Sequence, residues 1–163
     1  MKRLALAVSL ALAVAGGAEA QDRLRWQDVV GIIQAGNLVG SGAGQVQGGG
    51  QPWTTTAGFA EADLRHGIVK FNVRGLVLAG GNGIGTPGSI AEVKGTLVCD
   101  TDGSAGGGDS VLVDTPLVPL SAQGAAVFHG EVALPPACLN EPDVAFLIRI
   151  AAGRWIANGA VRR

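Results

Sequence analysis

The stretch AEADLRHGIVKFNVR, residues 60–74, decides the fold class of this chain. Apolar and polar residues alternate along both of its halves, and the apolar positions of the second half are Val69, Phe71 and Val73. A period of two belongs to a β-strand with one buried face. Gly67 ends a short Arg-His-Gly segment between the halves and supplies the backbone freedom that a tight turn requires. The pattern predicts a β-hairpin over residues 58–79.

The same alternation recurs toward the C-terminus, with turn residues between the segments. We expect further strands over residues 92–99, 111–113, 125–134, 143–150 and 154–161. Short strands spaced about eight to fifteen residues apart are typical of antiparallel sandwiches and barrels rather than of βαβ units. The sequence therefore predicts an all-β chain. We expect a single antiparallel β-sandwich, Ig-like or related, of about seven to nine strands with long Gly-rich loops, and a small β-barrel is the alternative.

The segment before these strands is less regular. Residues 26–33 are rich in Val and Ile, which favour strands, and Gly31 within them weakens a helix. Residues 35–37, Ala-Gly-Asn, have the composition of a tight turn. We therefore expect two strands in this part of the chain, joined as a hairpin at that turn.

Residues 1–20 have the organisation of a secretory signal peptide. A positively charged start precedes an apolar run that ends at Ala15, and small residues with an Ala-x-Ala cleavage site follow. An apolar run of about twelve residues is too short to cross a bilayer core of about 30 Å. We expect cleavage directly after residue 20, one β-sandwich domain over residues 21–163, and no membrane span after cleavage. The mature protein would then be secreted or periplasmic.

Composition argues against two classes of protein. The chain has 12 Lys and Arg against 13 Asp and Glu, a formal net charge of −1, and no basic cluster apart from Arg162 and Arg163. Nucleic-acid binding needs a basic surface to neutralise phosphates, so we expect no nucleic-acid partner. An outer-membrane barrel needs two girdles of aromatic residues, which three Trp and four Phe without any Tyr supply poorly.

Cys99 and Cys138 are the two cysteines of the chain. An exported protein with an even number of cysteines usually pairs them. We expect a Cys99–Cys138 disulfide, which would close a loop of about 40 residues and stabilise the fold by roughly 4 kcal/mol. A pair of buried thiols and a single catalytic thiol are the alternatives.

Three Gly-rich segments separate the predicted strands: residues 40–52, 80–89 and 100–110. Loops of this length in a compact domain are either functional or disordered. The third segment carries carboxylates that make weak metal candidates: Asp100, Asp102 and Asp109. A calcium loop also needs a third alternating ligand and a bidentate Glu, which this segment lacks, so we favour a solvated Asp-Gly turn.

Residues 83–88 match the spacing G-x-G-x-x-G of dinucleotide-binding loops. That site requires a helix to begin inside the motif, so that backbone N–H groups face the pyrophosphate. Here a strand pattern follows the motif directly. We therefore expect no nucleotide and no other cofactor.

His66 and His129 are the only histidines, and neither lies in a motif for catalysis. A hydrolase triad places a His beside a nucleophile and a carboxylate, and the chain has no Ser-centred elbow motif before a helix. The predicted turn around His66 and the polar strand face around His129 are ordinary places for a polar residue. The sequence predicts a non-enzymatic protein, with a hydrolase as the least favoured reading.

Trp53 follows Pro52 at the end of the first Gly-rich segment. An exposed tryptophan in that position would stack on the apolar face of a sugar ring, which makes Trp53 a candidate for ligand stacking. Tryptophan is mostly buried in folded proteins, so we expect Trp26 and Trp155 in the core and favour partial burial for Trp53.

These observations lead to an exported, non-enzymatic β-sandwich module that binds or packs against an envelope or secreted partner, either a protein or a glycan. A small-ligand-binding protein is the alternative, with carbohydrate at Trp53 or calcium at residues 100–110.

Overall fold

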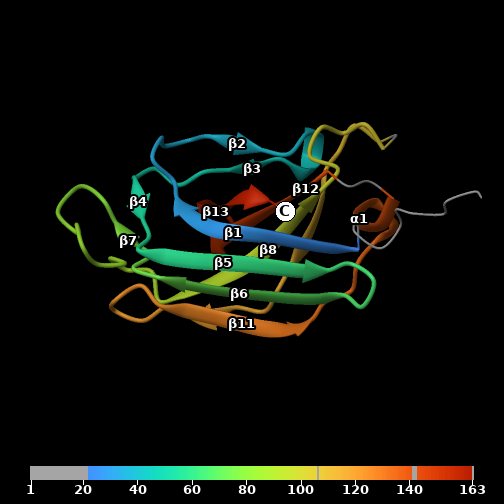
Figure 1. Cartoon of the computed structure of the whole chain (residues 1–163). Coiled ribbons are helices and arrows are strands. Elements are labelled where there is room, and N and C mark those ends of the chain that lie inside the picture. Colours follow the sequence, from blue (N-terminus) through green and yellow to red (C-terminus); the bar gives the residue numbers. More distant parts are fainter. Residues whose placement is uncertain (1–21, 106, 141–142, 163) are drawn as a thin grey trace, which may run out of the picture.

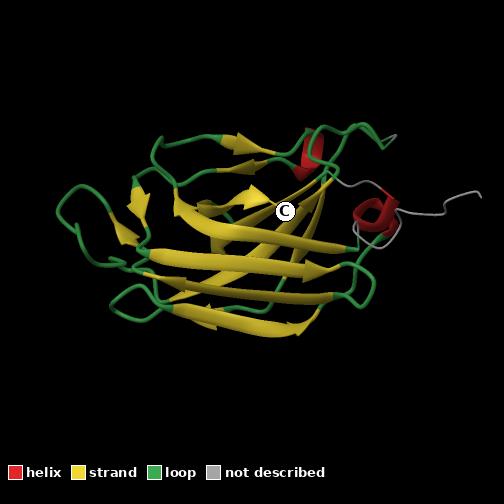
Figure 2. Ribbon diagram, viewed as in Figure 1, coloured by secondary structure: helices red, strands yellow, loops and turns green. Residues whose placement is uncertain are grey.

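The computed structural model describes residues 22–105, 107–140 and 143–162, so the predicted signal peptide at 1–20 lies outside the described residues. Nearly all of the regular structure is β (Figures 1 and 2). The strands of the main sheet are β1 (Arg23–Gly31), β5 (Ala57–Asp63), β6 (Ile68–Arg74), β8 (Glu92–Cys99), β9 (Val111–Asp114), β10 (Val118–Pro119), β11 (Ala126–Glu131), β12 (Val144–Ile150) and β13 (Trp155–Arg162). The smaller elements are β2 (Leu38–Val39), a 3-10 turn η1 (Gly42–Gly44), β3 (Val46–Gln47), β4 (Trp53–Thr54), β7 (Val77–Leu78) and the helix α1 (Pro136–Asn140).

The main sheet is antiparallel and has the strand order β10-β8-β12-β13-β1-β5-β6-β11, with β9 also paired to β8. Its two end strands, β10 and β11, are consecutive in the chain and are joined by a tight turn. In that turn the Ser121 N–H donates to the Ala125 carbonyl at 2.9 Å, and the Gly124 N–H donates to the Ser121 carbonyl at 2.8 Å. The sheet therefore curls round until its ends meet at one corner. The all-β antiparallel prediction is confirmed, and the curled sheet fits both the sandwich and the barrel.

The predicted hairpin is confirmed as β5 and β6. The two strands pair from Ala57 opposite Arg74 to Asp63 opposite Ile68, and Gly67 in the turn has a φ of +68°. On the far side of β5 lies β1, and on the far side of β6 lies β11. Figure 1 shows these four strands side by side across the front of the molecule.

Aromatic rings fill the space that the curled sheet encloses. The ring of Phe146 lies 5.6 Å from that of Trp26 and 5.8 Å from that of Phe71, centroid to centroid. Glycines on the same inner face leave room for these rings. A Cβ at Gly159 would lie 2.5 Å from the Trp26 ring, and one at Gly95 would lie 2.9 Å from the Phe71 ring. Large and small residues thus alternate on the inner face, as in other small barrels.

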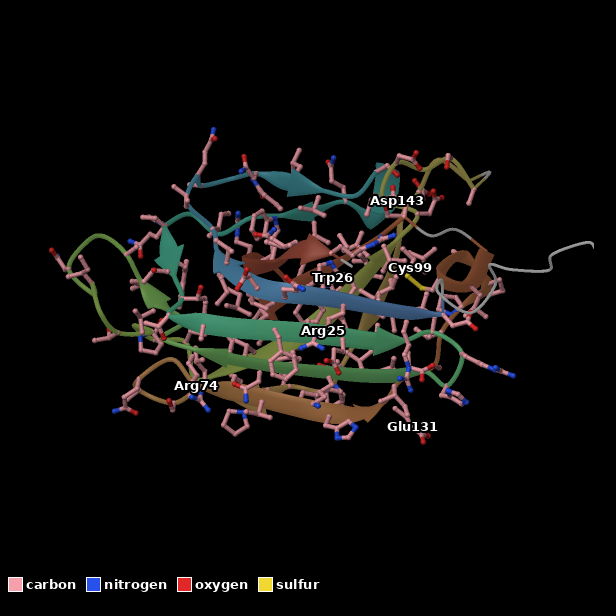
Figure 3. The ribbon with its side chains drawn as sticks, viewed as in Figure 1. Arg25, Trp26, Arg74, Cys99, Glu131 and Asp143 are labelled. Carbon is pink, nitrogen blue, oxygen red and sulfur yellow. A yellow bond between two sulfur atoms is a disulfide. The ribbon has the colours of Figure 1, made fainter. Side chains whose placement is uncertain are left out.

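The disulfide prediction is also confirmed. Cys99 at the end of β8 bonds to Cys138 in α1, with 5.0 Å between their Cα atoms, and both residues are fully buried. The bond fixes α1 to the end of the sheet (Figure 3). Across the residues described above, no helix is long and apolar enough to cross a membrane.

Two of the Gly-rich segments, 40–52 and 100–110, pack against each other. The Ser110 hydroxyl accepts a hydrogen bond from the Ser41 N–H at 2.8 Å, and the Ser110 N–H donates to the Ser41 carbonyl at 3.1 Å. A Cβ at Gly44 would lie 1.7 Å from the Ser110 carbonyl oxygen, so only glycine permits this close approach. Glycine in these segments therefore allows the two loops to pack closely against each other.

The hairpin predicted at residues 35–37 is wrong, although strands lie on both sides of it. Both edges of β1 are taken by β13 and β5, whereas β2 pairs with β3. The chain leaves the sheet at Ile32, whose N–H donates to the Ile156 carbonyl at 2.9 Å and whose carbonyl accepts from the Trp53 N–H at 2.7 Å. These long-range bonds direct the chain away from β1 and toward β2.

Candidate functional site

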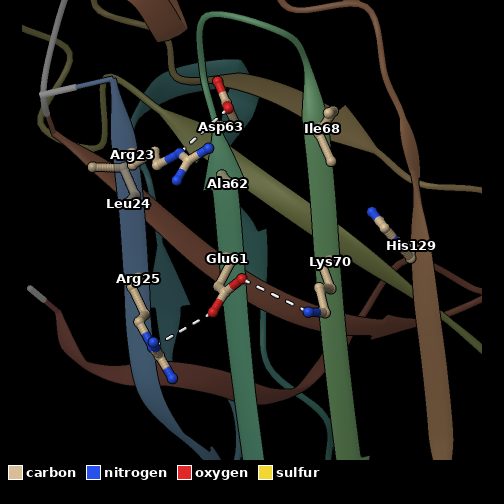
Figure 4. Close-up of a pocket in the computed structure, with 9 residues that line it drawn as sticks. All are labelled: Arg23, Leu24, Arg25, Glu61, Ala62, Asp63, Ile68, Lys70 and His129. Carbon is tan, nitrogen blue, oxygen red and sulfur yellow. Dashed lines mark ion pairs between the residues drawn. The ribbon is translucent and has the colours of Figure 1, made fainter. Parts of the chain in front are cut away.

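The outward-facing residues of β1, β5, β6 and β11 form rows that cross the sheet. In one row, Arg25 is opposite Glu61, Glu61 is opposite Lys70, and Lys70 is opposite His129. Residues directly opposite each other on one face have Cβ atoms about 5 Å apart, so their side chains interact. The register of three strand pairs therefore gathers two basic residues, one carboxylate and one imidazole into a single line (Figure 4).

A neighbouring row begins with Arg23, which is opposite Asp63, and continues to Ile68. The two rows border a hollow of about 440 Å³ on the outer face of the sheet. We call this site the outer hollow. Its lining residues are Arg23, Leu24, Arg25, Glu61, Ala62, Asp63, Ile68, Lys70 and His129. Three of them are Lys or Arg and two are Asp or Glu, so basic side chains outnumber carboxylates.

The basic side chains of the outer hollow are paired only loosely. Glu61 is shared between the Nε of Arg25 at 3.5 Å and the Nζ of Lys70 at 4.0 Å. Arg23 reaches Asp63 through its Nε, also at 3.5 Å. The two arginine side chains are 61% and 83% exposed, so the ends of their guanidinium groups remain open to solvent. An arginine in this state has N–H donors available for a second, bidentate carboxylate partner.

Asp63 is held more firmly than Glu61. The Nδ1 of His66 lies 3.0 Å from the Asp63 carboxylate, and the His66 N–H donates to it at 3.1 Å. The hydrogen bond from the His66 side chain lowers the pKa of Asp63, against the opposing effect of burial. Asp63 therefore closes the turn between β5 and β6 and remains ionised. Its hydrogen-bonding partners in the turn are closer than the two cations beside Glu61.

The two histidines lie in different polar surroundings. Asp63 is the hydrogen-bonding partner of the His66 side chain, and His129 lies on the exposed face of β11 beside Lys70. Among the residues that the structure describes, no Ser, Thr or Cys side chain hydrogen-bonds to either imidazole. The histidines considered for a hydrolase are therefore not joined to a nucleophile, and the non-enzymatic reading stays a prediction.

The aspartates considered as metal ligands serve the backbone of the loops. The Asp100 carboxylate accepts from the Ala105 N–H at 3.2 Å, and Asp102 Oδ1 accepts from the Ser104 N–H at 2.9 Å, which lowers the pKa of Asp102. Asp109 Oδ1 accepts from the N–H of residue 43, in the other Gly-rich segment, at 2.8 Å. In the described parts of the chain, no three His, Cys, Asp or Glu side chains lie close enough to share a metal ion.

Trp53, considered for sugar stacking, is 6% exposed. A ring buried to this degree does not present a face to a sugar, and only part of its edge borders a second, smaller hollow. Trp26 and Trp155, which we expect in the core, are 3% and 5% exposed, and their burial is confirmed.

The basic residues of the outer hollow were not predicted from the sequence. Arg23 and Arg25 alternate with Leu24 and Trp26, which is the signal of a strand, but the signal does not say which strand is opposite. The site exists because β1 pairs with β5, although more than thirty residues of chain separate Arg25 from Glu61. No family model matches this sequence, and comparison with curated proteins and with solved structures finds no match for it.

Proposed function

We propose that this protein is an exported, non-enzymatic binding module, and that its outer hollow binds a carboxylate-rich segment of another exported protein. The observation that carries the proposal is the row Arg25, Glu61, Lys70 and His129, in which one carboxylate serves two cations. The row therefore carries more positive than negative charge, and a carboxylate of the partner balances the excess.

An acidic protein segment suits the outer hollow better than a glycan does. None of the nine lining residues is a Trp, Tyr or Phe, and sugar-binding sites usually offer such a ring to stack on the pyranose. Arginine forks and a lysine recognise carboxylates, by paired hydrogen bonds and by charge respectively. Leu24 and Ala62 are buried, but half-buried Ile68 adds an apolar contact for the methylene groups of a Glu side chain.

Export is supported by the N-terminal sequence and by the disulfide. The Cys99–Cys138 bond requires an oxidising compartment to form and persist. The organisation of residues 1–20 is that of a signal peptide, which would deliver the chain to such a compartment. A partner in the cell envelope or outside the cell is therefore the one that the mature protein would meet.

Binding is tested with a short polyglutamate peptide as the probe, by isothermal titration calorimetry at low salt. We expect weak but saturable binding, which Arg25→Gln weakens by about fivefold because it removes an arginine–carboxylate contact. Arg74→Gln is the matched control. Arg74 lies on the same face of β6 as Lys70, is exposed, and does not line the outer hollow (Figure 3).

The glycan alternative is an outcome of the same experiment. If an acidic oligosaccharide such as polygalacturonate binds at least tenfold more tightly than polyglutamate, and Arg25→Gln abolishes that difference, the partner is a glycan. If Arg25→Gln and Arg74→Gln weaken polyglutamate binding equally, the effect is one of net charge and the proposed site is wrong.

A further inference from the structure

A second hollow, of about 180 Å³, lies between two of the Gly-rich segments, and we call it the Trp53 pocket. Its buried lining includes Trp53, Leu78 and Ile156, which are 6%, 9% and 1% exposed. Gly49 lines one side of it, and the exposed side chain of Arg154 lines its entrance. None of the residues that line the Trp53 pocket also lines the outer hollow, so the two sites are separate.

The indole N–H of Trp53 is a donor without an acceptor. Trp155 donates its Nε1–H to the Asn37 carbonyl at 3.0 Å, but no residue in the described ranges accepts a hydrogen bond from the Nε1–H of Trp53. Buried indole N–H groups normally have a partner. No fully enclosed side-chain nitrogen or oxygen of the described residues lacks one, so the Trp53 nitrogen is not sealed inside the core.

This nitrogen lies close to Gly49. A Cβ built on Gly49 would lie 3.9 Å from the Nε1 of Trp53, and Gly49 lines the pocket. Absence of a side chain at residue 49 therefore leaves the indole edge uncovered. The N–H donor therefore lies beside the wall of the pocket that Gly49 forms.

Arg154 adds a positive charge at the entrance. Its Nη1 donates to the Gly48 carbonyl at 3.2 Å, which holds the side chain beside the Gly-rich segment. Arg154 belongs to none of the ion pairs found among the described residues. An apolar pocket is therefore bordered by one cation and one unused N–H donor, and a carboxylate is complementary to both.

We propose that the Trp53 pocket binds a small aliphatic carboxylate. The aliphatic group contacts Leu78 and Ile156, and the carboxylate accepts the Trp53 N–H and pairs with Arg154. The size agrees with this ligand, since an apolar cavity of about 150 Å³ holds a benzene molecule. The same chemistry is offered by a free branched short-chain acid and by the C-terminal Leu of a peptide. The proposal does not depend on the function of the outer hollow.

The test follows the indole N–H resonances of the ¹⁵N-labelled protein during titration with isovalerate and with N-acetyl-leucine. Trp53→Phe assigns the Trp53 resonance by its disappearance. We expect a saturable shift of that resonance, with the signal of Trp155 unchanged because its N–H already has an acceptor. Isovaleramide, which has the same carbon skeleton without the charge, should shift the Trp53 resonance only at concentrations at least about tenfold higher.

Two variants test the contacts directly. Arg154→Gln should weaken isovalerate binding by about tenfold. Gly49→Ala should weaken it as well, because the added methyl group makes ordinary contacts at 3.4 to 3.9 Å and covers the indole edge without disturbing the fold. Gly107→Ala is the control, since a Cβ there meets no atom within 4 Å and Gly107 does not line the pocket, and it should leave binding unchanged.

The tighter of the two acids identifies the source of the ligand: isovalerate for a free acid, N-acetyl-leucine for a peptide C-terminus. Absence of a saturable shift with either acid would overturn the proposal. Equal affinity for isovalerate and isovaleramide would also overturn it, because the carboxylate would then have no role.

Discussion

Glycine within the strands determines how the aromatic rings of the core pack. A Cβ at Gly95 would approach Phe71 to 2.9 Å and Phe146 to 3.0 Å, and both rings are fully buried. Glycine in a strand interior usually weakens the strand, because it loses more conformational freedom and contributes no side chain. Here glycine lowers the strand propensity, but its lack of a side chain leaves the space in which the two buried rings pack.

Gly95→Ala should therefore destabilise the protein, although alanine is the better strand residue. The methyl group displaces two buried rings, and overpacking of this kind typically costs about 1–3 kcal/mol. Urea denaturation measures the difference. Gly50→Ala, whose Cβ would lie in open space, should change the free energy of unfolding by less than about 0.5 kcal/mol. Equal midpoints for Gly95→Ala and the wild type would contradict this packing.

Asp114 is the residue whose ionisation matters most to the far side of the sheet. It accepts hydrogen bonds from Lys94, from Thr96 at 2.6 Å and from Arg149 at 3.0 Å, and so connects β9 to β8 and β12. Burial opposes its ionisation, but these donors outweigh burial and lower the pKa of Asp114.

The stability contributed by Asp114 should depend on pH. Because the folded state lowers its pKa, the contribution is complete above the unfolded value of 3.8 and is lost as pH falls through the lower folded value. Asp114→Asn should destabilise the protein by about 1 kcal/mol at neutral pH, since the network is partly exposed. The variant should also lose less stability than the wild type below about pH 4.

Urea midpoints measured across this pH range test the prediction. Asp28→Asn is the control, because Asp28 is exposed and takes part in none of the ion pairs of the described residues. Parallel acid profiles for Asp114→Asn and the wild type would show that Asp114 is not the group responsible.

At the scale of the elements, local patterns were sufficient to predict the strands. The period-two alternation located β5, β6 and β11, because each has one face in the core and alternates accordingly. Apolar runs between turn residues located β8, β12 and β13, in which neighbouring residues on both faces are buried. The turn glycine Gly67, with its φ of +68°, indicated the hairpin of β5 and β6, whose pairing is local. These features depend on neighbours in sequence and are readable from it.

Pairing between distant strands was not readable in this way. The turn composition at residues 35–37 predicted a hairpin, yet both edges of β1 are occupied by β5 and β13, which alternation alone does not reveal. The outer hollow depends on the same pairing, since Arg25 meets Glu61 only through the register of β1 on β5. The Trp53 pocket likewise depends on two loops meeting, and the sequence indicated only that Trp53 lay beside one of them.

At the scale of the whole molecule, one curled sheet lies on both sides of the core. Its curl brings β10 and β11 together at the turn over residues 121–124, and the inner face forms one continuous core. The outer face of β1, β5, β6 and β11 carries the two rows that border the outer hollow. The Cys99–Cys138 bond joins α1 to this sheet and closes a loop with a sequence separation of 39.

Removal of that bond should destabilise the whole fold. The double variant Cys99→Ala, Cys138→Ala should lower the free energy of unfolding by about 3–4 kcal/mol, since a loop of this length then becomes unconstrained in the unfolded state. Urea denaturation with and without dithiothreitol is the measurement. Reductant should lower the midpoint of the wild type and leave that of the double variant unchanged. A wild type insensitive to reductant under unfolding conditions would contradict this role.

The outer hollow is short of negative charge, and substitution of Glu61 tests this most directly. Glu61 is the carboxylate shared by Arg25 and Lys70, so a carboxylate from a partner competes with it. The measurement is the affinity of Glu61→Gln and of Arg25→Gln for the polyglutamate peptide, compared with wild type by calorimetry. We predict opposite signs: Glu61→Gln binds about threefold to fivefold more tightly, and Arg25→Gln binds more weakly by a similar factor. Weaker binding by both variants, or no binding by the wild type, would contradict the account.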